Sequence, residues 1–142
     1  MKMVPVLEYQ DAKKIVDAIY QKALELHKAA VIAVCDAHGE LLALARMDGA
    51  PLSSIRVASN KAWTAARERK PTKDIGDKVR HPEKGFDIAY YGDDRFVGWG
   101  GGLPVSKNGY IVGGIGVSGL SSAEDIALAT VGVERFQKDD NA

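Results

Sequence analysis

A glycine-rich apolar run near the C-terminus, GYIVGGIGVSG at residues 109–119, constrains the fold more than any other stretch. Glycine inside a strand lets another segment approach the backbone closely, or bends the strand. The run therefore predicts a strand over residues 110–117 against which another element packs. Asn108-Gly109 separates this strand from the apolar run 103–107, and Asn-Gly between two such runs predicts a tight hairpin.

The same run spells Gly114-x-Gly116-x-x-Gly119, the pattern of dinucleotide-binding loops. Such a loop needs a helix and then a second parallel strand after it, but only 23 residues follow Gly119. Ser121 and Glu124 have the spacing of a helix capping box, and its acidic first turn would repel a phosphate. The glycines are therefore interpreted as packing residues rather than as a nucleotide site.

The remaining elements are predicted from hydrophobic periodicity and turn residues. Helical spacing predicts helices over about 9–28, 52–69, 72–80 and 122–137. The apolar runs 30–35 and 41–47 predict a hairpin that lies centrally and is covered on both faces, because neither run alternates. With a short strand near Phe96, residues 1–142 would form a single α+β domain. Its antiparallel sheet would have four to five strands, with helices packed on its faces.

Composition and single residues exclude several classes of function. Lysine plus arginine balance aspartate plus glutamate at 19 each, which gives no electrostatic case for nucleic acid or anionic membranes. The N-terminus lacks the apolar region of a signal peptide, so a cytoplasmic location is expected. Cys35 is the only cysteine and lies in an apolar strand, where a buried, inert thiol is the common case. A nucleophilic Cys35 paired with His38 is the less favoured alternative.

Two groups of side chains could bind a ligand. The irregular segment 81–102 carries aromatic residues that could line a pocket, pack the segment onto the sheet, or fill a subunit interface. These are Tyr90, Tyr91, Phe96 and Trp99. A polar set could hold a carboxylate or a propionate, or could simply be a solvated face. Its members are Arg46, Arg56, Asn60, Lys61 and Arg67.

Three histidines could ligate haem iron. His27 lies late in the first helix. It could instead cap the end of that helix, where a positive charge is favourable. His81 precedes Pro82 at the mouth of the irregular segment, and His38 lies in the first hairpin turn. Their spacing does not match a dedicated zinc site.

Two segments, RMDGAPLSSIRVASNKAWTA at 46–65 and GGGLPVSKNGYIVGGIGVSGLSSAEDIALA at 100–129, resemble the GlcG/HbpS family. That family includes the C-terminal domain of PduO-type proteins and the Klebsiella OrfY-type proteins. The resemblance covers nearly the whole chain and implies a profilin-like fold and a link to haem or corrinoid metabolism. The adenosyltransferase chemistry of PduO belongs to a separate helical domain that this chain lacks. Members that sense iron outside the cell carry export signals and iron-binding glutamate clusters, and neither is found here.

The resemblance and the residues together predict a ligand site. Its candidate residues are Arg46, Lys61, Tyr90, Tyr91, Trp99, Gly101, Gly102, Pro104 and Ser118, with His27 or His81 as axial haem ligands. We expect an accessory protein that binds haem, a corrinoid-type tetrapyrrole or a small carboxylate metabolite. The alternatives are an enzyme that degrades haem or acts on a small hydroxy- or oxo-acid, and a structural partner in a diol, glycerol or glycolate pathway.

A homo-oligomer, either a dimer or a multiple of dimers, is also expected. The sheet has edges that must be covered, the glycine-rich strand allows close approach, and the aromatics of segment 81–102 suit an interface. Nucleic acid and membrane are not expected among the partners.

Overall fold

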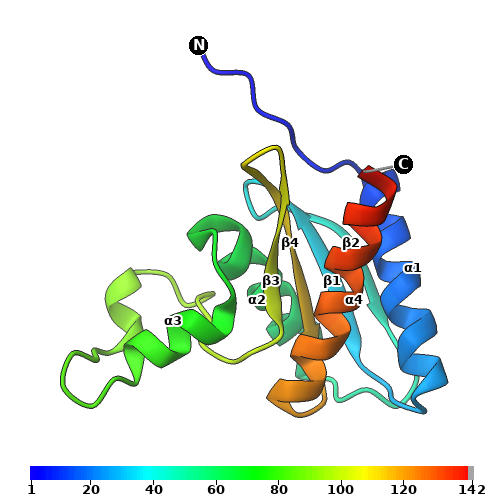
Figure 1. Ribbon diagram of the computed structural model, residues 1–142. Coiled ribbons are helices and arrows are strands. Elements are labelled where there is room, and N and C mark those ends of the chain that lie inside the picture. Colours follow the sequence, from blue (N-terminus) through cyan, green and yellow to red (C-terminus); the bar gives the residue numbers. More distant parts are fainter. Residues whose placement is uncertain (141–142) are drawn as a thin grey trace.

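The computed structural model of the protein describes residues 1–140 (Figure 1). Helices and two pairs of consecutive strands give an α+β arrangement, as the sequence predicts. In chain order they are α1 (Tyr9–Glu25), β1 (Val31–Asp36), β2 (Leu41–Arg46), α2 (Ser54–Glu68), α3 (Thr72–Val79), a 3-10 helix (Ile88–Tyr91), β3 (Gly102–Lys107), β4 (Tyr110–Ser118) and α4 (Ser122–Asp140).

The four strands form one antiparallel sheet in the order β2-β1-β4-β3. Helix α2 covers one face, whereas α1 and α4 lie side by side on the other (Figure 1). The tight hairpin between β3 and β4 is confirmed, because Asn108 and Gly109 both have positive φ, at 51° and 81°. The predicted α+β fold with an antiparallel sheet is therefore confirmed, with four strands.

The glycines of β4 are packing residues, as the sequence predicts. A Cβ on Gly114 would collide with the carbonyl oxygen of Ala62, and one on Gly116 with that of Ala58. Both alanines lie on α2, and both are fully buried. Small residues on both sides thus let α2 lie directly on the strand, and this close approach fixes where the rest of α2 is placed.

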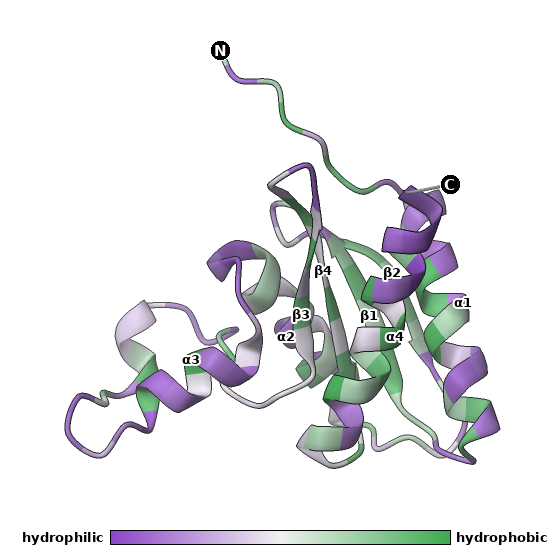
Figure 2. Ribbon diagram, in the orientation of Figure 1, coloured by the Kyte–Doolittle hydropathy of each residue, from purple (hydrophilic) through white to green (hydrophobic). Residues whose placement is uncertain are grey.

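The opposite face of the sheet carries the larger core. Ile15 and Ile19 of α1 and Leu128 of α4 pack against Ile32 and Ile115 of the sheet, and all are at most 2% exposed. Figure 2 shows the apolar sides of α1 and α4 turned toward the strands. The start of α4 has the predicted capping box, in which Ser121 Oγ accepts from Glu124 N at 3.2 Å and Glu124 Oε1 accepts from Ser121 N at 3.3 Å.

Two expectations from the sequence are wrong. Residues 88–91 form a 3-10 helix, and the part of the chain that the structure describes has no strand near Phe96. The first hairpin is not central, because β2 is an edge strand and only β1 is interior. Strand β4 is interior, and the element that its glycines admit is α2 of the same chain.

Helix α3 and the segment after it project away from the sheet (Figure 1). Two threonines tie this projection to the body. Thr64 Oγ1 on α2 donates to the carbonyl of Arg95 at 3.1 Å, and Thr72 Oγ1 on α3 accepts from the amide of Gly102 on β3 at 2.9 Å. Within the described residues, no helix combines the length and the apolar character needed to cross a bilayer.

Candidate functional site

A polar pocket of about 280 Å³ lies where α2, the end of β4 and the start of α4 meet. Lys61, Trp99 and Ser118, three of the predicted ligand-binding residues, line it. Ser54 and Asp125 line it as well. Neither was singled out as a binding residue from the sequence, where Asp125 stood only as an acid in the first turn of the last helix.

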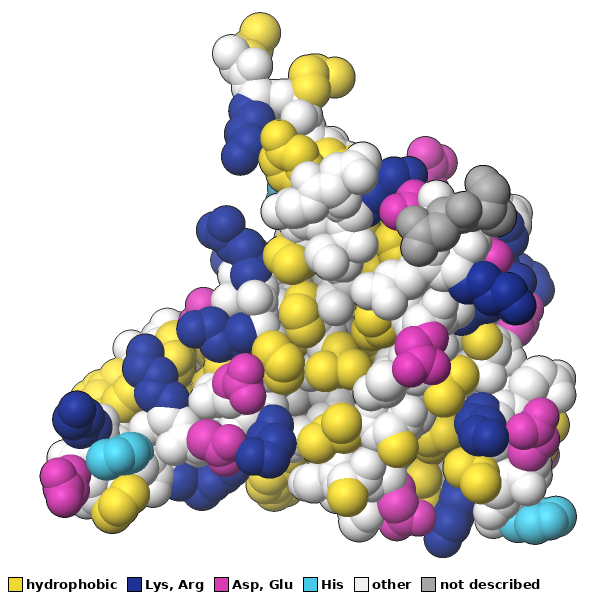
Figure 3. All heavy atoms as spheres, in the orientation of Figure 1, with side chains coloured by type: hydrophobic (Ala, Val, Ile, Leu, Met, Phe, Trp, Pro, Cys, Tyr) yellow, Lys and Arg dark blue, Asp and Glu magenta, His cyan; other side chains and the backbone are white. Residues whose placement is uncertain are grey.

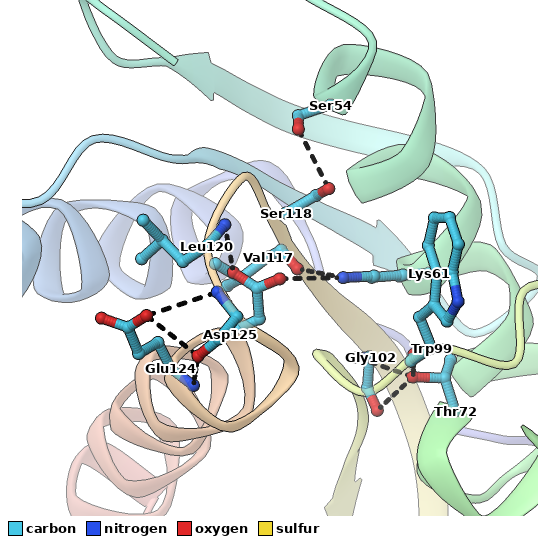
Figure 4. A network of polar contacts seen from close by, with 11 residues as sticks. Ser54, Lys61, Thr72, Trp99, Gly102, Val117, Ser118, Leu120, Glu124 and Asp125 are labelled. Carbon is cyan, nitrogen blue, oxygen red and sulfur yellow. Dashed lines mark hydrogen bonds and ion pairs between the residues drawn. The ribbon is translucent and has the colours of Figure 1, made fainter. Parts of the chain in front are cut away.

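The floor of this pocket is a buried ion pair (Figure 4). The Lys61 ammonium lies 3.1 Å from Asp125 Oδ2 and donates to the carbonyl of Val117 at 2.9 Å. The other carboxylate oxygen, Oδ1, accepts from the amide of Leu120 at 3.2 Å. Burial lowers the pKa of the Lys61 ammonium and raises the pKa of the Asp125 carboxyl, while the attraction between the two groups opposes both shifts.

Two serine hydroxyls stand beside the pair. Ser54 Oγ at the start of α2 and Ser118 Oγ at the end of β4 are 3.1 Å apart, and both residues are buried. Each hydroxyl can donate one hydrogen bond and accept others, so the bond between them leaves one hydroxyl hydrogen available. The pocket therefore offers both donors and acceptors to a small molecule.

The Gly-Gly-Leu-Pro segment begins beside Lys61, but its predicted binding residues Gly101 and Gly102 do not line the polar pocket. Gly101 has φ +123°, and a Cβ on it would lie 2.9 Å from Lys61 Nζ, so only glycine leaves room for the ammonium. The Gly102 amide donates to Thr72 Oγ1 at 2.9 Å. Pro104 lies farther along β3 and pairs with Gly114. It does not line the pocket.

The predicted tyrosines and Arg46 lie outside this pocket. Tyr91 stacks on Phe96 at 4.4 Å between ring centroids, and Phe96 meets the edge of Trp63 at 4.9 Å. These aromatics pack the projecting segment against α2, whereas packing onto the sheet was one of the alternatives predicted from the sequence. Tyr90 is 82% exposed, and Arg46 is exposed at the end of β2.

Trp99 separates the polar pocket from an apolar one. The apolar pocket, of about 330 Å³, lies within the projection and is lined by Val79, Arg80 and Phe96 among others. The Trp99 side chain lines both pockets while being 61% exposed. A large exposed aromatic between two pockets is suited to contact a ligand or another protein surface.

The histidines lie far apart, and the space-filling view shows histidine side chains at opposite ends, over the projection and near the end of α1 (Figure 3). His81 Nδ1 accepts from the amides of Glu83 and Lys84 at 3.2 and 3.0 Å, which leaves only Nε2 for a ligand. His27 lines a pocket of about 290 Å³ together with Tyr20 and Leu24.

His38 and Cys35 provide no reactive pair. His38 is exposed in the first hairpin turn, where its amide donates to Asp36. Burial raises the pKa of the Cys35 thiol to about 12, so the thiolate is scarce at neutral pH. Within residues 1–140, no group of three or more metal-binding side chains could hold a metal ion.

Comparison with known proteins gives a consistent picture. The family described as "Haem degrading protein HbpS-like" matches residues 7–134. A 15.0 kDa protein from the dhaT-dhaS intergenic region of Citrobacter freundii is 37% identical over 127 residues, 89% of each chain. The corrinoid adenosyltransferase PduO of Salmonella typhimurium is 29% identical over 89% of this chain, but the match spans only 38% of PduO.

Two solved structures are close to this one over almost their whole length. Klebsiella pneumoniae ORFY superposes with a TM-score of 0.92 at 31% identity, covering 96% of this chain and 94% of the other. The complex of PduOC with haem superposes with a TM-score of 0.85 at 28% identity, covering 92% and 94%.

Proposed function

Because the chain belongs to the HbpS-like family, we propose that it is an accessory protein that binds haem or a closely related tetrapyrrole. The haem complex of PduOC supports this proposal, since the similarity covers nearly all of both chains. The observation that carries it in this chain is the position of His27 in a pocket with apolar walls.

The His27 pocket offers apolar side chains to a flat ring, beside the charged Lys28 and Asp48. Tyr20, Leu24 and Met47 line it, and Tyr20 and Leu24 remain 37% and 45% exposed. Covering such apolar side chains yields roughly 25 cal/mol for each Å² removed from water. Among the residues that line this pocket, His27 is the one imidazole that could ligate the iron.

The backbone holds His27 at the end of the helix. Its φ is +55°, and the amide of Lys28 donates to the carbonyl of Ala23 at 2.9 Å, as in a helix-terminating motif. Lys28 also lines the pocket, and its ammonium pairs with Glu124 at 3.2 Å on the surface. A haem propionate could take the place of Glu124 as the partner of this lysine.

We also propose that the protein works as a homo-oligomer. Strand β2 is an edge with unpaired backbone groups, and edges of this kind are normally paired or covered. Leu52, Ile55 and Trp99 are exposed by 70%, 37% and 61% and lie on or next to the start of α2 and its pocket. A second copy that covers them would remove this apolar surface from water.

Native mass spectrometry of the protein purified from its own host tests both proposals together. We expect a retained tetrapyrrole and a mass of two or more chains. Added haem should also produce a saturable shift of the Soret band. The haem proposal would be contradicted if neither haem nor cobalamins bound saturably while small hydroxy acids did bind.

A further inference from the structure

The Lys61–Asp125 pair is buried in an unusual place. Lys61 is 2% exposed and Asp125 is 3% exposed, yet both line the polar pocket rather than sealed core. The ammonium has three hydrogens and two acceptors, the Val117 carbonyl and the Asp125 carboxylate. One donor of a nearly buried cation therefore remains for a molecule in the pocket.

Stability alone explains this pair poorly. Removing two charges from water costs several kcal/mol per ion, and apolar residues of the same volume often serve as well or better. A structural pair also needs no pocket beside it. By contrast, a lysine that must react as an amine needs burial, a neighbouring proton acceptor and access for a substrate.

We propose that Lys61 Nζ forms a reversible imine with a small, neutral hydroxy-carbonyl compound that enters the polar pocket. This proposal is independent of haem binding, because the polar pocket and the His27 pocket share no lining residue. It assigns to the buried pair a reaction that the proposed ligand-binding function does not include.

The geometry supplies each proton transfer of imine formation. The Asp125 carboxylate, 3.1 Å from Nζ, accepts one proton from the ammonium and leaves a free amine. The amine lone pair attacks the carbonyl carbon, and the carbonyl oxygen takes the proton from Asp125. The resulting carbinolamine carries a protonated nitrogen. Asp125 accepts one proton from this nitrogen and donates it to the carbinolamine hydroxyl group. Water then leaves, and the balance is one ammonium plus one carbonyl giving one protonated imine plus one water.

The surroundings of the pair favour a neutral substrate. Among the residues that line the pocket, Lys61 is the one cation and Asp125 the one acid, so their charges cancel. A carboxylate would meet the negative charge of Asp125 without a second cation to offset it. The hydroxyls of Ser54 and Ser118, which lie 3.1 Å apart, suit a substrate hydroxyl.

Borohydride trapping of the haem-free wild-type protein tests the proposal. Hydroxyacetone is the neutral probe, because a ketone reacts sluggishly with exposed amines, and pyruvate is its anionic counterpart. Peptide mass mapping then reports the reduced adduct at each lysine, so the eleven other lysines of the chain serve as internal controls. We expect hydroxyacetone to label Lys61 at least tenfold more than any other lysine. Equal labelling of all lysines, or an unlabelled Lys61, would overturn the imine. Labelling by pyruvate alone would overturn the neutral substrate class.

Two variants separate reactivity from mere position. Asp125→Asn keeps the shape of the side chain but cannot accept the proton, and positioned acid–base groups typically contribute about 10²–10⁴-fold. We expect the initial trapping rate at Lys61 to fall at least tenfold. The control is Asp77→Asn, which removes the exposed partner of Lys73 and should leave the rate unchanged. An unchanged trapping rate in a folded Asp125→Asn protein would show that Asp125 does not take part in the reaction. Ser118→Ala is a second variant of the pocket, and it leaves the ion pair in place.

Discussion

The ammonium of Lys61 on α2 lies 3.1 Å from the carboxylate of Asp125 on α4, although the two helices cover opposite faces of the sheet. The pair joins the two helices near the start of β3, and the Lys61 ammonium also donates to the carbonyl of Val117 on β4. A single buried ion pair thus connects both helical layers with the sheet and also forms the floor of the polar pocket.

Removing one member of this pair should destabilise the protein strongly. Lys61→Met leaves a buried carboxylate without its cation, and such losses cost about 3–5 kcal/mol in the free energy of unfolding. Urea unfolding measures it. The matched control, Lys73→Met, breaks the exposed pair with Asp77 and should change the free energy by less than about 1 kcal/mol. A Lys61→Met loss as small as the control would contradict a buried, mutually compensated pair.

Gly116→Ala should be among the most damaging changes in β4. The added methyl group would strike the carbonyl of Ala58, so α2 would have to move away from the sheet. Overpacking of this kind costs about 1–3 kcal/mol, and backbone rather than a flexible side chain blocks the way here. Thermal unfolding should show a larger loss than Gly92→Ala, where a Cβ meets no atom within 4 Å and only the φ of +79° is unfavourable. Equal losses would mean that the close approach of α2 contributes little.

The projecting segment should loosen in acid. Arg95 donates to both carboxylate oxygens of Asp93, at 3.0 and 2.8 Å, and lowers the pKa of that carboxyl from 3.8 to about 2. Since the folded pKa lies below the unfolded one, the stabilisation is present above about pH 4 and is lost as the pH falls toward 2. A carboxyl titration followed by NMR should place the Asp93 midpoint near 2, and Arg95→Gln should raise it. A wild-type midpoint near 3.8 would show that the ion pair does not form in solution.

Light scattering at micromolar concentration should report at least a dimer. One chain has a mass of 15.2 kDa, so the expected value is twice this or more. We expect Trp99→Lys to shift the mass toward one chain. Tyr9→Lys, at a residue of α1 that is 52% exposed against 61% for Trp99, should not shift it. A wild-type mass of one chain would contradict the oligomer and would favour a role of the exposed aromatics in ligand binding.

Much of the fold could be predicted because it follows from local rules. The Asn108-Gly109 turn and the capping box of Ser121 and Glu124 each depend on a few adjacent residues, and both are confirmed. The strand expected near Phe96 was wrong because aromatic content there reflects packing on Trp63 rather than pairing in the sheet. Which strand lies at an edge depends on long-range pairing, which the non-alternating sequence of β2 does not reveal.

The candidate site was less predictable for the same reason. Lys61 and Ser118 were predicted as binding residues, and both line the polar pocket. Asp125 lies 64 positions from Lys61 in the sequence, so only the fold brings the two together. The motif residue Gly101 was assigned to the ligand site, whereas its direct neighbour in the structure is the Lys61 ammonium. A lysine at a buried position of an otherwise alanine-rich helix stripe was the available signal, since lysine is almost never fully buried without a partner.

An equilibrium titration of ferric haem tests the central claim most directly, with the wild type, His27→Ala and His81→Ala measured side by side. We expect saturable binding with a shifted Soret band in the wild type and in His81→Ala. His27→Ala should lose that shift or bind at least tenfold more weakly, because the pocket of Tyr20, Leu24 and Met47 would lack its iron ligand. No saturable binding by the wild type, or identical spectra and affinities for all three proteins, would contradict a haem site built around His27.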